Sequence, residues 1–417
     1  MKSLLTKILP FFLLGLIGNM QIAIAQTSIK PMAMNGIVNV STWNFEDGGS
    51  IELSGDWLFI WDRLITPTNK NIDDKSGIYV KFPGIWTNYL INNKTYPSYG
   101  SASYRLIVKG LEINREYALE IPDMYSSYQL WLGDKIIAKN GQVGMNKEEY
   151  RPQWIPKTVT FQAKNTTDTL ILNISNFDHV KGGVKNEIWL GTVDQLMTDR
   201  NSEIASNLVL SIGITILGIL SIVSFFKYSN RLFIYFTFFC FIWAIRGLFP
   251  TMYLFYQWIP DFNWIIGLKI EYLTIYSSVM IGYYIFHQLF EDTSKKTFKH
   301  ISFAINSVFI ILTLFGPAFI FTKLLNIYFA FMGVTLIYIL NEVIKAYLYD
   351  KEGAGYVGIA IALVSLLFLY DMLSYYKFLP FNPFVTSIGY VVFYGLLGFS
   401  LRYNILNKKE VEPYRFS

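Results

Sequence analysis

Charged side chains are scarce in this chain of 417 residues: Asp, Glu, Lys and Arg make up 16% of it, whereas hydrophobic residues make up 53%. A soluble globular domain usually carries about 25% charged residues. The apolar excess is uneven, because it lies at the very start of the chain and again after Asn207. This distribution indicates a membrane protein in which a more polar region precedes the membrane-spanning part.

Cysteine and histidine are also rare. The single cysteine, Cys240, excludes an intramolecular disulfide and lies inside an apolar run. The three histidines, His179, His287 and His300, fall in separate segments, so we expect no histidine-based metal site and no cofactor. The sequence has no phosphate-binding loop, dinucleotide-binding motif or zinc-protease motif, and its Lys and Arg residues do not cluster. We therefore expect neither an enzyme nor a nucleic-acid-binding protein.

The first residues have the pattern of a secretory signal. Lys2 and Lys7 form a positive start, an apolar stretch follows, and a small-residue A-x-A pattern ends at Ala25. We predict a signal peptide over 1–25, followed by a polar lead-in segment over 26–50. The region after the signal peptide is then expected to lie outside the cytoplasm.

Residues 51–191 alternate between apolar and polar positions, which is typical of β-strands with one buried face. One side of the first such segment carries four apolar residues, Leu53, Trp57, Phe59 and Trp61. Turn-forming Gly, Pro and Asn residues separate the segments, and no amphipathic helix intervenes. We predict that this region folds as an exported all-β jelly-roll sandwich.

A few residues in this region are candidates for ligand contact. Arg105 and Trp131 alternate away from the apolar sides of their strands, so we expect them to line the second face of a sheet, where they would meet a sugar or cap a sandwich edge. The polar loop that contains Asn176, Asp178 and His179 either contacts a ligand, contacts the membrane domain or simply turns the chain.

Seven apolar stretches follow within 207–402, each long enough to cross a bilayer as a helix. They cover 208–226, 232–249, 264–289, 301–321, 324–340, 353–373 and 378–401. A connector over 192–206 precedes them, and a short cytoplasmic tail over 403–417 follows. With an exported N-terminal region, Lys and Arg concentrate in the predicted cytoplasmic loops, and the outer loops hold only Lys323 and Lys377. The predicted fold is therefore a mixed one, an all-β domain followed by an all-α seven-helix transmembrane bundle.

Three charged residues lie inside the predicted helices. Arg246 in the second helix and Glu271 in the third fall at similar depth in the outer third of the bilayer, and Asp371 near the outer end of the sixth helix is expected to join them. Charged groups at this depth are costly and are by default candidate functional sites. This intramembrane polar cluster either couples the exported domain to helix movement or fixes helix packing as a static pair.

Five segments of 51–191 resemble one known ectodomain, the second extracellular domain type of the seven-transmembrane receptors with diverse intracellular signalling modules. In chain order they are LSGDWLFIWDRL, VKFPGIWTN, YGSASYRLIV, YQLWLGDKIIAKNGQVG and NISNFDHVKGGVKNEIWLGT. That ectodomain is similar to the galactose-binding-like jelly roll at the N-terminus of some β-glycosidases. The resemblance implies a sensor domain with carbohydrate as the candidate ligand class, and it transfers no binding residue. In this family the last helix usually leads into an output module, for which the 15 residues after Arg402 are too short.

The leading hypothesis is a transmembrane signal receptor in a bacterial inner membrane, with the jelly roll in the periplasm and the C-terminus in the cytoplasm. It would bind a small-molecule ligand and signal to a separate cytoplasmic protein, and a homodimer is one candidate arrangement. The alternatives are a truncated or split part of a longer receptor kinase or cyclase, a transporter with a sugar-binding ectodomain, and a membrane enzyme that handles glycans. The sequence shows neither an internal repeat for a transporter nor paired catalytic carboxylates for such an enzyme.

Overall fold

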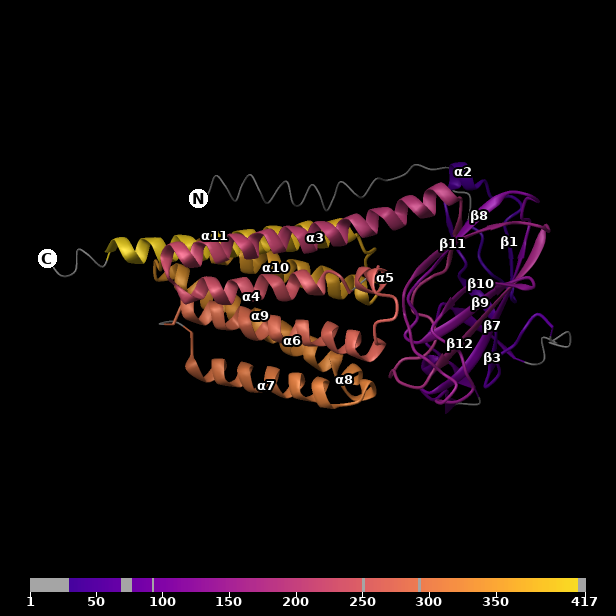
Figure 1. The fold of residues 1–417 in the computed structure, drawn as a ribbon, viewed down its shortest axis with the longest axis horizontal. Coiled ribbons are helices and arrows are strands. Elements are labelled where there is room, and N and C mark those ends of the chain that lie inside the picture. The colour runs from indigo at the N-terminus through magenta and orange to yellow at the C-terminus, as the bar shows by residue number, and fades with distance from the viewer. Residues whose placement is uncertain (1–29, 69–76, 92–93, 250–251, 292–293, 412–417) are drawn as a thin grey trace.

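The computed structural model describes residues 30–68, 77–91, 94–249, 252–291 and 294–411. A β-sandwich forms the N-terminal part and a helical bundle forms the C-terminal part, and the sandwich sits at one end of the bundle (Figure 1). The expected order of an all-β domain and a helical domain is confirmed. The predicted signal peptide, 1–25, lies outside the described residues.

Two main sheets make up the sandwich. The larger sheet has the strand order β10-β9-β12-β7-β3-β4, with the short strand β1 added in parallel to β7. The smaller, antiparallel sheet has the order β11-β8-β13-β2, and β5 pairs with β6 in a separate hairpin. The bounds in the larger sheet are β1 Ile37–Asn39, β3 Gly55–Trp61, β4 Ile78–Phe82, β7 Gly100–Lys109, β9 Ser127–Leu132, β10 Lys135–Asn140 and β12 Thr167–Asn176. The others are β2 Ile51–Glu52, β5 Leu90–Ile91, β6 Lys94–Thr95, β8 Glu116–Ile121, β11 Lys157–Gln162 and β13 Trp189–Gly191, with short helices α2 Phe45–Gly48 and η2 Trp86–Asn88.

The core of the sandwich is rich in aromatic rings. Trp57 and Phe59 of β3 are 0% and 1% exposed, and Trp57 stacks on Phe82 with ring centroids 4.1 Å apart. The indole Nε1 of Trp57 donates a hydrogen bond to Leu53 O over 2.9 Å, so its one polar atom has a partner inside the core. Large rings that bury their whole surface dominate the stability of such a core.

The second face of the larger sheet is also covered, which corrects the expectation of strands with one buried face. Leu58 and Ile60 of β3 lie on that face and are buried. They pack with Ile65 and Ile171 in a small second cluster. The N–H of Ile65 donates to Ser103 Oγ over 3.0 Å, which holds the chain after β3 against the sheet. Alternation along the sequence predicted the strand, but it could not show that a later segment returns to cover the other face.

Long helices form the bundle and run side by side (Figure 1). Helix α3 contacts α4 and α11, helix α6 contacts α4 and α7, and helix α10 contacts α9 and α11. The bounds of the long helices are α3 Val193–Tyr228, α4 Arg231–Arg246, α6 Trp264–Leu289, α7 Lys296–Phe315, α9 Leu325–Leu348, α10 Ala354–Tyr375 and α11 Pro383–Val411. Two short helices lie at the sandwich end, α5 Leu254–Trp258 and α8 Ala318–Lys323.

Within the described part of the chain, 6 helices are long and apolar enough to cross a membrane. The expected second span is the exception, because α4 has only 16 residues, or about 24 Å. It packs closely between α3 and α6: Cys240 is fully buried, and a Cβ added at Gly218 of α3 would lie 3.1 Å from Cys240 Cβ. The chain is thus a multi-pass membrane protein whose helix α4 is shorter than predicted.

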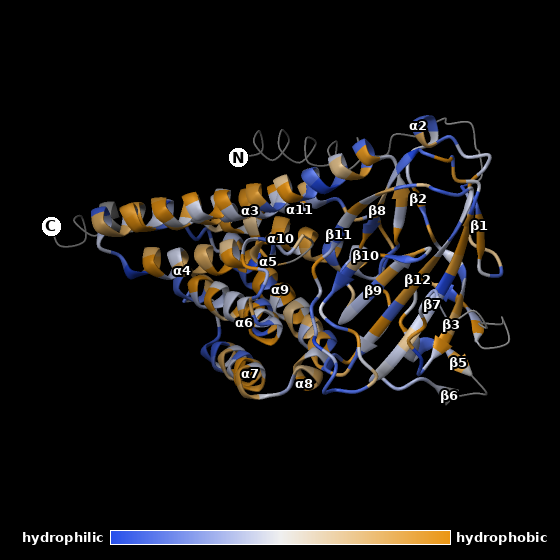
Figure 2. Cartoon of the chain, turned by 45° about the vertical axis from the view of Figure 1, so that its right-hand side comes forward, coloured by the Kyte–Doolittle hydropathy of each residue, from blue (hydrophilic) through white to orange (hydrophobic). Residues whose placement is uncertain are grey.

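Helix α3 joins the two parts of the molecule without a loop. It begins at Val193, and Thr192 caps it by accepting a hydrogen bond from Gln195 N–H at 3.3 Å. Most of the predicted connector, 192–206, is therefore the first turns of one 36-residue helix. At 1.5 Å per residue this helix is about 54 Å long, compared with a hydrocarbon core of about 30 Å. Figure 2 shows more hydrophilic residues near its sandwich end and mainly hydrophobic ones along the rest.

Candidate functional site at the domain junction

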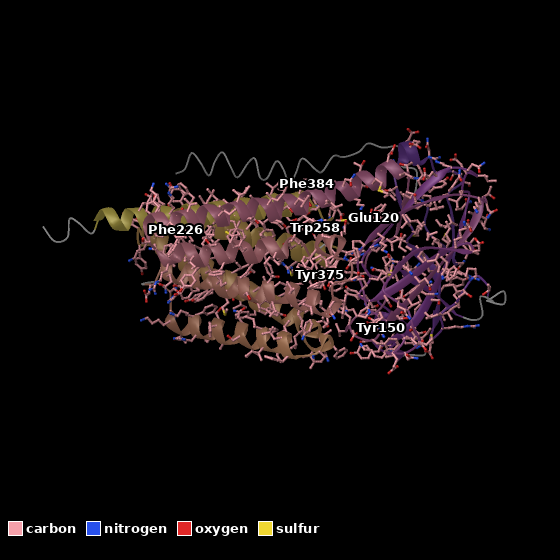
Figure 3. The ribbon with its side chains drawn as sticks, viewed as in Figure 1. Glu120, Tyr150, Phe226, Trp258, Tyr375 and Phe384 are labelled. Atoms are coloured by element: carbon pink, nitrogen blue, oxygen red, sulfur yellow. The ribbon has the colours of Figure 1, made fainter. Side chains whose placement is uncertain are left out.

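The candidate site is the surface where the sandwich meets the bundle, and we call it the domain junction. The bundle contributes the segment with α5, the segment with α8 and the turn between α10 and α11, and the sandwich contributes the loops after β8, β10 and β12. Figure 3 shows Trp258 and Tyr375 at this end of the bundle and Phe226 at the opposite end. The bundle loops in the junction are those that the sequence predicted to lie on the same side as the exported domain.

Aromatic rings make the apolar contact across the junction. Trp154 of the sandwich is 4% exposed, and its ring centroid lies 5.2 Å from that of Tyr253 and 5.5 Å from that of Trp264 in the bundle. A second contact joins the rings of Tyr99 and Phe319, whose centroids are 5.6 Å apart. Aromatic pairs of this geometry contribute about 0.5–1.5 kcal/mol each beyond the burial of their surface.

Polar side chains also join the two parts. Lys377 Nζ forms an ion pair with Glu187 Oε1 at 2.7 Å. Lys181 Nζ donates to Tyr375 Oη over 2.8 Å, and the ammonium of Lys185 lies 3.6 Å from the centre of the Tyr375 ring. A single tyrosine of the bundle therefore holds two lysines of the loop that follows β12.

Asp123, in the loop after β8, places a carboxylate against the bundle. Tyr253 Oη donates to Asp123 Oδ2 over 3.5 Å, and the Lys185 ammonium is near enough to interact with this carboxylate. Burial raises the pKa of Asp123 to about 6, although Lys185 and the Tyr253 hydrogen bond oppose this effect. Burial likewise lowers the pKa of Lys185 to about 8. Both charges are thus partly removed from water at the contact between the two parts.

The three charged residues predicted inside the membrane lie close together at the sandwich end of the bundle. Arg246 Nη1 donates to the backbone oxygen of Glu271 over 3.0 Å, and its charge acts on the carboxylates of both Glu271 and Asp371. Tyr390 Oη donates to Asp371 Oδ2 over 2.6 Å. One oxygen of each carboxylate, Glu271 Oε2 and Asp371 Oδ1, is buried without a hydrogen-bond partner. Among the residues that the structure describes, no ion pair closes between Arg246 and either carboxylate.

A series of polar groups connects this cluster to the sandwich. The carboxylates of Asp123 and Glu271 interact electrostatically with each other, and both interact with Tyr253. We call Lys185, Asp123, Tyr253, Glu271 and Arg246 the junction polar chain. Its members come from two loops of the sandwich, one loop of the bundle and two helices, α4 and α6.

The loop after β12 both turns the chain and contacts the bundle. Asn176 shapes the turn: its Oδ1 accepts hydrogen bonds from the N–H groups of Asp178 at 3.3 Å and His179 at 3.0 Å, and its Nδ2 donates to Lys181 O at 3.2 Å. Asp178 forms an ion pair with Lys147, also in the sandwich. Lys181 then reaches the bundle. Asn176 and Asp178 thus have partners within the sandwich, and ligand contact by either stays a prediction.

A pocket of about 320 Å³ lies between the sandwich and the bundle. Tyr125, His179 and Lys181 line it from the sandwich, and Lys323 and Tyr375 line it from the bundle. Its volume falls at the lower end of the range for small-molecule sites. Of the ligand-binding candidates from the sequence, His179 is the one that lines this pocket. Over the described ranges, no group of three or more His, Cys, Asp or Glu side chains is placed to hold a metal ion.

The structure places Arg105 and Trp131 together on the second face of the larger sheet. Ile171 of β12 pairs with Trp131 of β9 on one side and with Arg105 of β7 on the other, so the three residues form a row. Trp131 packs against the buried cluster on this face, and its Nε1 has no hydrogen-bond partner. Neither residue lines the junction pocket. Ligand contact by this row is a separate prediction from contact at the junction.

Several junction residues were missed by sequence reasoning. Tyr125, Lys181 and Tyr375 gave no signal, because aromatic residues and lysines are common in loops. Lys323 and Lys377 did give a sequence signal, because they are the only lysines in the predicted outer loops. Both lie in the junction. A cation that departs from the charge pattern of a membrane protein can thus mark a contact with a neighbouring domain.

The fold and the junction define a multi-pass membrane protein with a β-sandwich docked on one end of its helical bundle. At the level of family, residues 205–404 match the family model described as 7TM diverse intracellular signalling. This is the receptor family that the ectodomain segments resemble, and the match confirms it over the membrane part of the chain. No curated protein matches the chain.

Solved structures with a similar part include three glycoside hydrolases, and each match covers 34% of this chain. A GH2 β-galacturonidase from Eisenbergiella tayi bound to galacturonate has 16% identity, a TM-score of 0.24 and 24% of its own length covered. A glycosyl hydrolase family 2 member from Bacteroides cellulosilyticus has 13% identity, a TM-score of 0.26 and 20% covered. A β-glucuronidase from Faecalibacterium prausnitzii has 12% identity, a TM-score of 0.26 and 31% covered. The chain thus matches less than a third of the length of each hydrolase.

Proposed function

We propose that the protein is a transmembrane signal receptor. The sandwich binds a small molecule outside the cytoplasm, the helical bundle responds, and a separate cytoplasmic protein reads the response. In this proposal the membrane is a bacterial inner membrane, the sandwich lies in the periplasm and the chain itself catalyses no reaction. The match of residues 205–404 to a signalling family supports the role, and the sequence resemblance makes carbohydrate the first ligand class to test.

The observation that carries the proposal is the junction polar chain. Asp123 belongs to the sandwich, whereas Glu271 and Arg246 belong to helices α6 and α4. Charges in a partly dry environment interact more strongly than charges in water, so a small displacement of Asp123 changes the energy of the helix residues. A ligand that alters how the sandwich sits on the bundle therefore also alters the preferred arrangement of these helices.

Helix α3 provides a second, mechanical connection. Its first turn contacts the sandwich through Gln195, whose Nε2 donates to Phe45 O over 2.9 Å, and α3 also packs on β8 and β11. Arg200 of the same helix donates to Gln257 of α5 over 3.0 Å. Because α3 continues unbroken to Tyr228, a tilt of the sandwich moves the helix that leads to the far end of the bundle.

The coupling is tested by measuring a distance at the far end of the bundle. In a Cys240→Ala background, Phe226→Cys and Leu348→Cys introduce spin labels at two exposed sites, and the full chain is studied in lipid nanodiscs. A panel of neutral and acidic mono- and disaccharides is then added. A saccharide that binds is expected to shift the label distance by about 1–2 Å or more, the usual size of helix shifts in signalling.

Two tryptophans give a matched pair of variants for this experiment. Trp154→Ala removes the main aromatic contact of the junction and is expected to abolish the distance change. Trp258→Ala removes a ring that is 61% exposed at the same end of the bundle and is expected to leave the change intact. A saccharide that binds tightly yet leaves the distance unchanged in the unmodified protein contradicts the receptor proposal.

Orientation is tested by reporters fused after Ser417 in a bacterial host. A fluorescent protein that folds only in the cytoplasm is expected to be bright, and an alkaline phosphatase that is active only in the periplasm is expected to be inactive. The opposite pair of results would place the C-terminus outside the cytoplasm and contradict the proposed direction of signalling.

A further inference from the structure

The junction pocket has a positive character. Lys181 lines it from the sandwich and Lys323 lines it from the bundle. The pocket lining includes neither Asp nor Glu among the residues that the structure describes. Two lysines, one from each part of the molecule, with no carboxylate in the described lining, favour an anionic ligand.

The carboxylates near the pocket residues in sequence do not line the pocket, and two of them form ion pairs elsewhere. Asp178, next to His179, forms an ion pair with Lys147. Glu187 forms an ion pair with Lys377 across the junction. These partners leave the charges of Lys181 and Lys323 without a neutralising carboxylate in the pocket wall.

The other groups in the pocket suit a hydroxyl-bearing ring. Tyr125 stacks on His179 with ring centroids 4.7 Å apart and planes at 8°, and Tyr272 and Tyr375 add two further rings to the lining. Tyr125 Oη is buried without a hydrogen-bond partner. Burial lowers the pKa of His179 to about 4, so the ring is neutral near pH 7 and adds no charge. Aromatic faces combined with a few hydrogen-bonding groups are typical of sites for sugar-like rings.

We propose that this pocket binds a small organic anion, a hydroxylated ring that carries a carboxylate or a phosphate, between Lys181 and Lys323. Its volume of about 320 Å³ fits a molecule of monosaccharide to disaccharide size. This inference rests on the proposed function and names the ligand class of the receptor. It places the binding site between the two parts of the molecule rather than on the second face of the larger sheet.

A ligand in this position acts on the junction directly. Its anionic group contacts Lys181 and Lys323, which belong to different parts of the molecule, so it binds tightly only when the sandwich and the bundle adopt the arrangement that brings both lysines to the pocket. Binding therefore shifts the population toward that arrangement. Lys181 also contacts Tyr375 in the last turn of α10, and Lys323 is the last residue of α8. A ligand that holds both lysines therefore acts on the positions of these two helices.

The test is calorimetric titration of the full chain in lipid nanodiscs with matched probes. Glucuronate and galacturonate supply the carboxylate, glucose 6-phosphate supplies the phosphate, and glucose and galactose supply the same rings without charge. At least one anionic probe is expected to bind at least about tenfold more tightly than its neutral counterpart, as loss of a charged hydrogen bond predicts. Comparison of the carboxylate and phosphate probes then identifies which anion the pocket prefers.

Three lysine variants locate the site. Lys323→Gln and Lys181→Gln are each expected to weaken binding of the anionic probe about tenfold or more and to leave the weak binding of the neutral sugar unchanged. Lys164→Gln is the matched control, because Lys164 is exposed and precedes β12, whereas Lys181 follows its other end. Lys323 is itself exposed, so its variant is expected to keep the unfolding temperature of the unmodified protein.

Three results would overturn this assignment: equal binding of neutral and acidic sugars, unchanged affinity in the Lys323→Gln variant, or no binding of any anionic probe at millimolar concentration. Failure of the receptor proposal is distinguishable, because it is measured by the distance between labels at Phe226→Cys and Leu348→Cys. Anion binding that depends on both lysines but moves no helix supports the pocket and contradicts the receptor. Helix movement caused by a neutral sugar, independent of both lysines, supports the receptor and contradicts the pocket.

Discussion

The interior of the sandwich and the domain junction are held together in different ways. Inside the sandwich, Trp57, Phe59 and Tyr104 are almost completely buried, and the rings of Phe59 and Tyr104 lie 5.0 Å apart within a large continuous core. Across the junction, the polar contacts include a hydrogen bond of 3.5 Å from Tyr253 to Asp123, and the apolar contacts are a small number of rings.

The difference shows where the molecule can change its arrangement. A core of interlocking rings resists movement, because any displacement opens a cavity and loses apolar burial. Polar contacts between two parts of one chain resemble a transient protein interface, and their opening costs less than global unfolding. We therefore expect a ligand to act at the junction while the sandwich itself stays rigid.

The largest effect is expected for a substitution in the sandwich core. Phe59→Ala removes a ring that contacts Trp61, Tyr89, Tyr96 and Tyr104. It should destabilise the sandwich by about 3–5 kcal/mol, because the lost burial and the cavity both contribute. The measurement is chemical unfolding of the full chain in detergent, followed by the β-sheet signal in circular dichroism.

Ile113→Ala provides the control for this prediction. Ile113 is 56% exposed, so its truncation should change the free energy of unfolding by no more than about 0.5 kcal/mol. Trp154→Ala, at the junction, should lower the free energy of unfolding of the sandwich by an amount between those for Ile113→Ala and Phe59→Ala. If Phe59→Ala lowers the free energy of unfolding no more than Trp154→Ala does, the core and the junction do not differ as described.

A smaller effect is expected on the stability of the folded state when pH changes, because two residues beside the junction have shifted pKa values. Burial raises the pKa of Asp123 from 3.8 to about 6, so between these values the folded state binds more protons than the unfolded state and stability falls as pH rises. Burial lowers the pKa of His179 from 6.5 to about 4, so in nearly the same window the folded state binds fewer protons and stability rises with pH. The two contributions oppose each other.

Variants of Asp123 and His179 separate the two contributions to the pH dependence of stability. As pH rises from about 4 to about 6, the stability of Asp123→Asn should increase relative to that of the unmodified protein. Over the same range, the stability of His179→Gln should decrease relative to that of the unmodified protein. The measurement is the unfolding temperature of the full chain in nanodiscs at several pH values. Loss of the His179 stacking contact shifts the whole curve and leaves its slope interpretable. Parallel curves for all three proteins would show that neither group has a perturbed pKa.

The sequence predicted most of the elements but not the contacts between the two parts of the molecule. Alternation predicted β3, and apolar length predicted the spanning helices, because both patterns depend on residues close in the chain. Helix α4 ends at Arg246 and is shorter than predicted. The apolar residues that follow it, including Phe249, pack in the cluster at the junction and do not continue the helix. Hydrophobicity alone does not distinguish a residue in a span from one buried beneath a domain.

The junction could not be predicted because its partners are far apart in the chain. Asp123 and Tyr253 are separated by 130 positions, and Lys181 and Tyr375 by 194. No local period relates such residues. The depth argument placed Arg246 and Glu271 at similar height because the rise per residue fixes height in a helix, and in the structure the two residues are in contact. It did not predict that Arg246 donates to the backbone of Glu271 instead of its carboxylate.

The smallest effect is expected for the ion pair between Lys377 and Glu187. The two side chains are 46% and 25% exposed, and pairs of this kind usually contribute less than about 1 kcal/mol. A double-mutant cycle with Lys377→Ala, Glu187→Ala and the double variant should therefore give a coupling energy below about 1 kcal/mol, decreasing further at high salt. Unfolding of the full chain in detergent measures it. A coupling above about 2 kcal/mol, insensitive to salt, would show that this edge of the junction is rigidly locked, and the expected difference between a rigid core and a movable junction would not hold there.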